Sequence, residues 1–166
     1  RATGQAVAWL PHRGAARAVL GAREARLRDG WTPCRTCGAP VREPGHCLPC
    51  RSLLESPQVR AAATRLECNP DLALEDPEGL YPGAGVYALN CARELALASL
   101  EAQMDRLLPE TVSGGHEYLS YLRVLANSYL SLKLSLPMGA LGRAERRELP
   151  ERVRNVLSAA ESAGPV

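Results

Sequence analysis

The sequence contains no phenylalanine, and aromatic residues together make up only 4% of its 166 residues. Aromatic side chains favour β-strands, so their scarcity argues against a protein built from sheets. Apolar residues still account for 46% of the chain, and leucine, alanine and valine supply most of them. A chain of this length can bury a core without disulfides. The composition therefore predicts a mainly α-helical fold with a core of leucine, valine and alanine.

The sequence also lacks any run of about 20 uninterrupted apolar residues, the length that a membrane-spanning helix needs. It has no charged-then-apolar beginning of the kind that marks a signal peptide. Four of its six cysteines fall into closely spaced pairs typical of a metal site, which indicates a reducing compartment. We therefore expect a cytoplasmic protein without a membrane partner. The first residue, Arg1, is not methionine, which suggests a fragment of a longer chain or a processed start.

Motifs of the common enzyme classes are absent as well. No glycine-rich loop ends in Gly-Lys-Ser or Gly-Lys-Thr, and the one lysine, Lys133, falls within a predicted helix. His116-Glu117 resembles the start of a zinc-protease helix, but no second histidine follows at the required spacing. No serine stands in a nucleophile-elbow setting. We therefore predict a protein that is not an enzyme, with no catalytic residues and no small-molecule substrate.

The strongest chemical signal is a pair of Cys-x-x-Cys motifs, Cys34 with Cys37 and Cys47 with Cys50. Two such turns facing each other supply four sulfurs in the tetrahedral arrangement that zinc favours. A redox dithiol would need a single pair within alternating strands and helices, which the sequence does not show. His46 is an alternative ligand, but Cys47 completes the regular spacing, so we treat His46 as a neighbour. Four cysteines leave no open position, so we predict a structural Zn²⁺.

Charge is distributed unevenly along the chain, although the formal net charge is only +2. Residues 1–65 hold eleven arginines against four acidic residues, a balance of +7, whereas residues 66–142 have a balance of −6. Arginine on a rigid zinc knuckle, with one aromatic ring beside it, can contact phosphates and stack on a base. The alternatives are a solvated charged face, or a knuckle that only docks onto helices or another protein with the tryptophan buried. The candidate nucleic-acid-binding residues are Arg17, Arg23, Arg26, Trp31, Arg35, Arg42 and Arg51.

Apolar periodicity and proline or glycine breaks predict helices on both sides of the cysteine motifs. In the long predicted helix over 86–108 Glu94 falls on the solvent side, while Cys68 and Cys91 are expected to be small buried residues in helices. The seam of the following helix is Tyr118, Leu122, Leu125, Tyr129, Leu132 and Leu136, a spacing that favours lengthwise packing in an antiparallel hairpin. The predicted helices are 14–28, 57–67, 86–108, 113–136 and 150–160, with a short helical turn at 71–74.

The organisation predicted from these elements is a helical bundle with an inserted four-cysteine zinc ribbon or knuckle. Residues 1–68 contain the basic helix, the ribbon and the helix after it. Residues 69–85 form an acidic connector rich in proline and glycine, and residues 86–162 form the hairpin and the C-terminal helix. The three parts can also form one compact unit.

The run from Trp31 to Pro40, Trp-Thr-Pro-Cys-Arg-Thr-Cys-Gly-Ala-Pro, together with Cys47-Leu-Pro-Cys50, resembles the zinc-ribbon segment of some DciA-type bacterial replicative helicase loaders. Similar knuckles occur in RecO-type recombination mediators. The resemblance covers residues 31–51, and the small KH-like α/β domain of the loader family is not visible in this sequence. It implies that the four cysteines are metal ligands, and that DNA and the replicative helicase are partners.

Two functions are therefore expected from the sequence. The first is a non-enzymatic zinc-ribbon module that binds single-stranded or duplex DNA and also contacts a protein, in DNA replication if the resemblance holds. The second is a protein–protein interaction or oligomerisation module with structural zinc and no nucleic-acid contact. Exposed, clustered arginines would favour the first, and an exposed apolar seam on the hairpin would favour the second.

Overall fold

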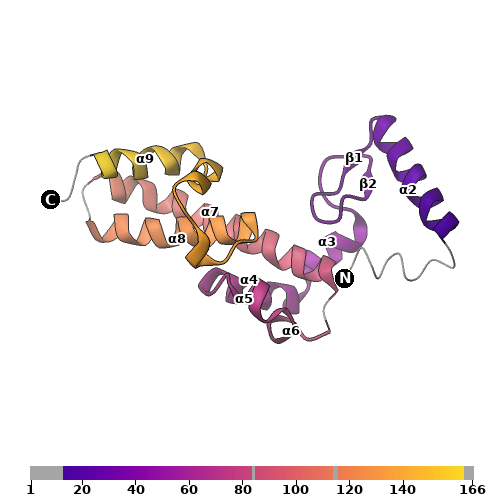
Figure 1. The fold of residues 1–166 in the computed structure, drawn as a ribbon, viewed down its shortest axis with the longest axis horizontal. Helices are drawn as coiled ribbons and strands as arrows, with labels where there is room; N and C mark the ends of the chain where they lie inside the picture. Colours follow the sequence, from indigo (N-terminus) through magenta and orange to yellow (C-terminus); the bar gives the residue numbers. More distant parts are fainter. Residues whose placement is uncertain (1–12, 84, 114–115, 163–166) are drawn as a thin grey trace.

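The computed structural model describes residues 13–83, 85–113 and 116–162. It confirms a mainly α-helical fold in which a small cysteine-bearing knuckle is inserted among the helices (Figure 1). The elements in chain order are α2 (Arg13–Arg28), β1 (Thr32–Pro33), β2 (Pro40–Val41), α3 (Leu48–Glu55), α4 (Pro57–Cys68), α5 (Leu72–Glu75), α6 (Pro77–Leu80), α7 (Val86–Val112), α8 (His116–Leu134), the 3₁₀ turns η1 (Met138–Ala140) and η2 (Ala144–Glu148), and α9 (Glu151–Ser162).

Helix α7 is the element on which α3, α4, α8 and α9 pack. Its N-terminal half buries the small side chains of Ala88, Cys91, Ala92 and Ala96. Small side chains let a neighbouring helix approach closely, and α4 uses this face. The side chains that α4 buries are Val59, Ala62, Ala63 and Leu66. The helices before and after residues 69–85 therefore share one core.

Helix α8 runs back along α7 as the second arm of the hairpin (Figure 1). Four residues of the expected seam are buried, whereas Tyr118 is 44% exposed. The buried four are Leu122, Leu125, Tyr129 and Leu132. The helix ends at Leu134, two residues earlier than expected, because Ser135 adopts a positive φ of 53°. Leu136 then donates its N–H to the carbonyl of Ser131 at 3.2 Å, which closes the helix end.

Proline does not end α7 where the sequence analysis placed its end. The helix continues through Pro109 to Val112. Proline removes one backbone hydrogen bond, the one to the carbonyl of Asp105, but both Asp105 and Pro109 are exposed, so water can solvate the freed carbonyl. The hydroxyl of Thr111 also donates to the carbonyl of Leu107 at 2.9 Å. The expectation that the helix stops at Leu108 is therefore wrong by one turn.

The segment between α4 and α7 contains two short helices rather than one. Asp76 caps the unexpected one, α6, by accepting a hydrogen bond from the N–H of Gly79 at 2.9 Å, and Pro77 begins it.

At the C-terminal end of α4, Cys68 is exposed, so the expectation that it is buried is wrong. Cys91 is fully buried, as expected. Cys68 is exposed because it is the last residue of α4 and lies beyond the apolar stripe that α4 packs against α7.

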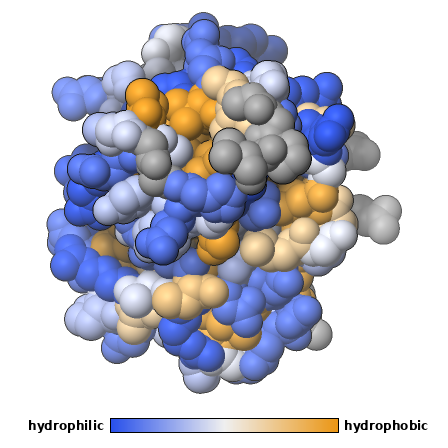
Figure 2. Space-filling model, turned by 90° about the vertical axis from the view of Figure 1, so that its left-hand side faces the viewer, coloured by the Kyte–Doolittle hydropathy of each residue, from blue (hydrophilic) through white to orange (hydrophobic). Residues whose placement is uncertain are grey.

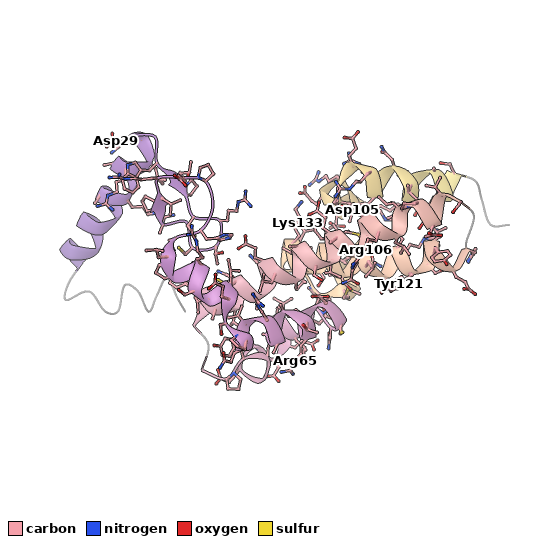
Figure 3. All side chains as sticks on the ribbon, turned by 180° about the vertical axis from the view of Figure 1, so that it is seen from behind. Asp29, Arg65, Asp105, Arg106, Tyr121 and Lys133 are labelled. Atoms are coloured by element: carbon pink, nitrogen blue, oxygen red, sulfur yellow. The ribbon has the colours of Figure 1, made fainter. Side chains whose placement is uncertain are left out.

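The knuckle and the far end of the bundle lie at opposite ends of an elongated molecule (Figure 1). Helix α9 covers the far end, where Val153 and Leu157 are buried against α7 and α8. Seen from behind, Asp29 lies at the knuckle end and Arg106 and Tyr121 lie at the other (Figure 3). Among the described residues, no helix is both long enough and apolar enough to cross a membrane.

Candidate metal centre

The first knuckle is a turn between two short antiparallel strands. Thr32 pairs with Val41 and Pro33 with Pro40, and the N–H of Cys34 donates to the carbonyl of Ala39 at 2.7 Å. Gly38 has a φ of 68°, in the left-handed region that glycine adopts without strain. This turn brings Cys37 back over Cys34 and leaves both sulfurs on its inner side, where the N–H of Ala39 lies 3.5 Å from the sulfur of Cys37.

The second knuckle is the start of a helix that the sequence analysis did not predict. Cys47 immediately precedes α3, and Cys50 lies in its first turn and is only 2% exposed. Pro49 suits this place because the N–H groups of a first helical turn have no intrahelical partner. The N–H of Cys47 points at the sulfur of Cys34, 3.3 Å away, and so links the two knuckles.

The two knuckles place all four cysteine sulfurs within 4.8 Å of one another. The sulfurs of Cys37 and Cys47 are 3.6 Å apart. A tetrahedral zinc ion with Zn–S bonds of about 2.3 Å requires sulfur separations of about 3.8 Å, so the observed spacing fits. The cluster brings together the four predicted ligands, Cys34, Cys37, Cys47 and Cys50, and it can hold a metal ion compatible with zinc. Comparisons with models of known protein families, with curated proteins and with solved structures give no match.

The thiols of the cluster differ in how readily they ionise. Burial opposes ionisation of Cys34, but backbone N–H groups of Cys37, Cys47 and Thr36 outweigh it and lower the pKa of Cys34 from 9.0 to about 6. Burial raises the pKa of Cys50 far above its usual value, and burial also raises the pKa of Cys37. The turn therefore provides one thiolate at neutral pH, and a metal ion has to displace protons from Cys37 and Cys50.

One carboxylate of α7 binds both knuckles at once. Glu94 accepts a hydrogen bond from the hydroxyl of Thr36, which lies between the first two cysteines. Its other oxygen lies 2.7 Å from Nε2 of His46, the residue before Cys47. His46 therefore contacts α7 and lies outside the group of four sulfurs. Three residues earlier on the same helix, the buried thiol of Cys91 lies 3.7 Å from the carbonyl of Cys50. The sequence analysis missed the roles of Glu94 and Thr36.

The structure brings four of the predicted nucleic-acid-binding residues together beside the first knuckle. The guanidinium carbons of Arg26 and Arg42 lie 5.4 and 5.3 Å from the centre of the Trp31 ring. A Cβ added at Gly38 would lie 2.5 Å from a guanidinium nitrogen of Arg23, which shows that this arginine covers the knuckle turn. Arg35 and Arg51 are exposed and do not lie over the ring, and the structure does not describe the side chain of Arg17.

Some arginines at the far end of the molecule have carboxylate partners, whereas the exposed arginines around the knuckle have none among the described residues. At the far end, Arg146 pairs with Glu161, and Arg152 pairs with Glu101 and Asp105. Within the described ranges, no carboxylate lies within ion-pair distance of the exposed arginines of α2, the knuckle and α3. These are Arg23, Arg26, Arg28, Arg35, Arg42 and Arg51. Their charge is therefore available to a partner.

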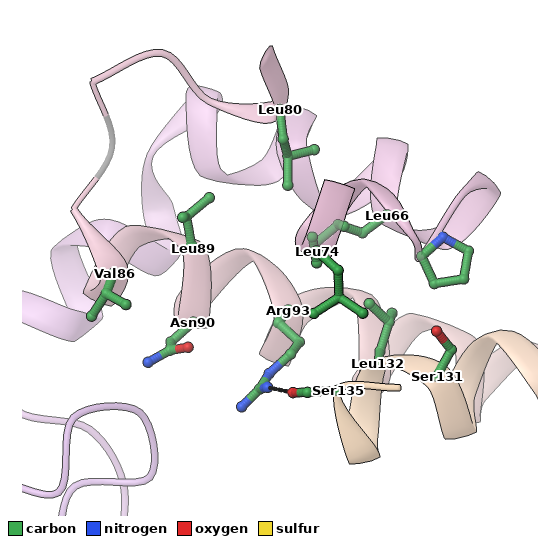
Figure 4. A pocket seen from close by; sticks show the side chains of 12 residues that line it. Leu66, Leu74, Leu80, Val86, Leu89, Asn90, Arg93, Ser131, Leu132 and Ser135 are labelled. Carbon is green, nitrogen blue, oxygen red and sulfur yellow. Dashed lines mark hydrogen bonds between the residues drawn. The ribbon is translucent and has the colours of Figure 1, made fainter. Parts of the chain in front are cut away.

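A separate apolar pocket lies between α4, α7 and the end of α8 (Figure 4). Its walls include Leu66, Leu80 and Leu132, and Arg93 donates to the hydroxyl of Ser135 at its rim, at 2.7 Å. The cavity volume is about 140 Å³. This is below the roughly 300 Å³ at which small-molecule sites usually begin.

The outer face of α8 carries apolar and aromatic side chains that no other described element covers. Tyr118, Tyr121 and Val124 are 44%, 52% and 56% exposed, and Val112 at the end of α7 is 71% exposed. At this end of the molecule hydrophobic groups alternate with hydrophilic ones (Figure 2). Leu122 and Tyr129, two of the residues expected to form an exposed seam in a protein-binding module, are buried in the core.

Proposed function

We propose that this chain is a non-enzymatic zinc-knuckle module that binds nucleic acid at its basic end and acts as an adaptor through its helical end. The observation that supports this most directly is the set of exposed arginines around the knuckle that have no carboxylate partner among the described residues. In this proposal the metal makes the knuckle turn rigid, and the rigid turn holds the arginines in position to bind nucleic acid.

The metal in this proposal is a structural zinc ion. Four cysteines complete a tetrahedral shell and leave no open position for a substrate or a water nucleophile. The knuckle has few apolar residues of its own, so little hydrophobic burial stabilises it. Zinc binding contributes on the order of 10 kcal/mol in small zinc modules, which is enough to order a segment of this size.

Nucleic acid is the partner class that best complements the basic end. Arginines that lie close together repel one another, and a phosphate chain removes this repulsion while accepting planar, bidentate hydrogen bonds. Two arginines of the C-terminal half, Arg146 and Arg152, already have carboxylate partners in Glu161 and in Glu101 with Asp105, so they need no such ligand. Phosphate contacts also position a protein on either single-stranded or duplex nucleic acid without reading sequence.

A role in DNA replication is the more specific form of the proposal. The knuckle resembles the zinc-ribbon segment of DciA-type helicase loaders, and that resemblance makes DNA and the replicative helicase the partners to test first. The protein partner would dock at the helical end, where Tyr118, Tyr121 and Val124 are exposed. In the same proposal the protein acts in the cytoplasm.

The test is a binding titration of the zinc-loaded chain with single-stranded and duplex oligonucleotides at two salt concentrations. We expect affinity to fall steeply with salt. The triple variant Arg23→Ala, Arg26→Ala, Arg42→Ala should reduce the slope of log affinity against log salt by about 2 to 3. Binding that is absent, or indifferent to salt, would contradict the proposal.

A matched control removes the same charge from the other end of the molecule. Arg106, Arg143 and Arg147 are exposed and distant from the knuckle in the chain. Their triple alanine variant should keep nearly all of the affinity and most of the salt slope. Equal losses in the two triple variants would indicate that net charge alone, and no defined surface, drives binding.

The second candidate is a protein-interaction module with structural zinc and no nucleic-acid contact. The exposed Tyr118, Tyr121 and Val124 favour it, because such a strip on a helix is typical of an interaction surface. A pull-down with and without nuclease separates the two candidates. A partner that survives nuclease treatment and is lost in a Tyr121→Ala variant, together with no oligonucleotide binding, would establish the second.

A further inference from the structure

We propose that the ligand of the basic end is the sugar-phosphate backbone alone, and that Trp31 serves as a platform for Arg26 and Arg42 instead of stacking on a base. This inference rests on the proposed function and narrows its ligand class. It also revises the expectation from the sequence, in which the ring beside the knuckle stacks on a base.

The backbone brings two arginines from separate segments to one ring. The N–H of Trp31 donates to the carbonyl of Arg26 at 3.1 Å, so the tryptophan folds back onto the last turns of α2. The next residue, Thr32, pairs with Val41 in the hairpin, which places Arg42 beside the ring from the other strand. Helix α2 and the loop after β2 thus meet at the indole.

Two arginines already lie over the Trp31 ring. Both guanidinium carbons lie within 5.4 Å of the ring centre, inside the distance at which a cation and an aromatic ring attract each other. The indole is itself half-buried. A base that stacked on the same surface would have to displace an arginine and give up the contact that it replaces. A phosphate group can be bound with both arginines left in place.

The platform also orders the arginines before the ligand arrives. A free arginine side chain has many rotamers, and holding it against a flat ring removes part of the entropy that binding would otherwise cost. Arg23 lies one helical turn before Arg26 on α2 and extends the same face toward the Gly38 turn. Glu24 and Glu43 are sequence neighbours of this group but lie beyond ion-pair distance of it.

The experiment compares two oligomers of equal length, one an ordinary single-stranded oligonucleotide and the other a fully abasic strand with the same number of phosphates. We expect the zinc-loaded wild-type chain to bind both strands with affinities within about threefold. Trp31→Leu should weaken both to a similar extent, by about three- to tenfold, while Trp31→Phe, which keeps a ring, should restore most of the loss. Zinc content and circular dichroism verify that each variant is folded, and the wild-type comparison does not depend on any variant.

Each result has a separate meaning. An ordinary strand that binds at least tenfold more tightly than the abasic strand, with the difference lost in Trp31→Leu, would show base stacking and overturn this inference while leaving nucleic-acid binding intact. Binding of neither strand would overturn the proposed function and this inference with it. Equal binding of both strands, unaffected by Trp31→Leu, would overturn the platform role.

Discussion

Glu94 is the residue whose replacement should loosen the knuckle most without touching a metal ligand. It accepts hydrogen bonds from Thr36 and His46, one on each knuckle, and it lies in the N-terminal third of a packed helix. Glutamine keeps its length but loses the charge and one accepting oxygen. The variant Glu94→Gln therefore weakens the connection between the knuckle and α7 while leaving all four sulfurs in place.

The size of the effect follows from the exposure of these groups. A hydrogen bond to a charged group contributes about 1.5–3 kcal/mol when buried. The side chains of His46 and Glu94 are 20% and 29% exposed, so water replaces part of what is lost. We expect a net cost of about 1–2 kcal/mol for the docked knuckle, which corresponds to zinc release about 5- to 30-fold faster if the knuckle must undock before a chelator reaches the metal.

The assay follows the transfer of zinc from the loaded chain to a chromogenic chelator in excess. The control is Glu110→Gln, an exposed glutamate on the same helix that should leave the rate unchanged. A Glu94→Gln variant that releases zinc within twofold of the wild-type rate would refute the reasoning. In that case the docking contacts would add nothing to metal retention.

Three further predictions follow from the packing and exposure of particular side chains. Cys34→Ser should release the metal and disorder the knuckle, while circular dichroism should retain the signal of the α7–α8 hairpin; a global loss of helix would show that the bundle depends on the metal. Leu122→Ala, at a fully buried site, should cost about 2–5 kcal/mol in denaturant unfolding, whereas Val124→Ala, 56% exposed, should stay within about 0.5 kcal/mol. In the zinc-loaded chain a thiol reagent should modify the exposed Cys68 rapidly, whereas the buried Cys91, whose pKa burial raises, should react only on unfolding.

The parts of the fold that could be predicted from the sequence depend on local signals. The cysteine spacing identifies the four clustered residues because a Cys-x-x-Cys turn is complete within four positions. The longer helices follow from apolar periodicity and from their breaks, and the seam from Leu122 to Tyr129 is buried as expected. Helices α3 and α6 are too short to show a period, although Pro49 and Asp76-Pro77 are start signals that a closer reading could have used.

The contacts that hold the knuckle to the body could not be predicted because they join distant parts of the chain. Glu94 lies 58 residues from Thr36 and 48 residues from His46, and on a helical projection it falls among charged residues on the solvent side. Nothing in its local pattern distinguishes it from Glu101, whose partner is Arg152. The pairing of Trp31 with Arg26 and Arg42 likewise depends on how α2 meets the hairpin, which periodicity does not specify.

The length of α7 fixes how the two ends of the molecule are related. The helix has 27 residues, which corresponds to about 40 Å, and it holds the knuckle through Glu94 in its N-terminal third and α9 through Glu101 and Asp105 in its C-terminal half. Inserting one residue between Glu94 and Glu101 would advance one end by about 1.5 Å and also turn it by about 100°. A ligand bound at the basic end is thus kept at a fixed distance and a fixed angle from a partner bound at the helical end. The number of residues in α7 determines both the distance and the angle.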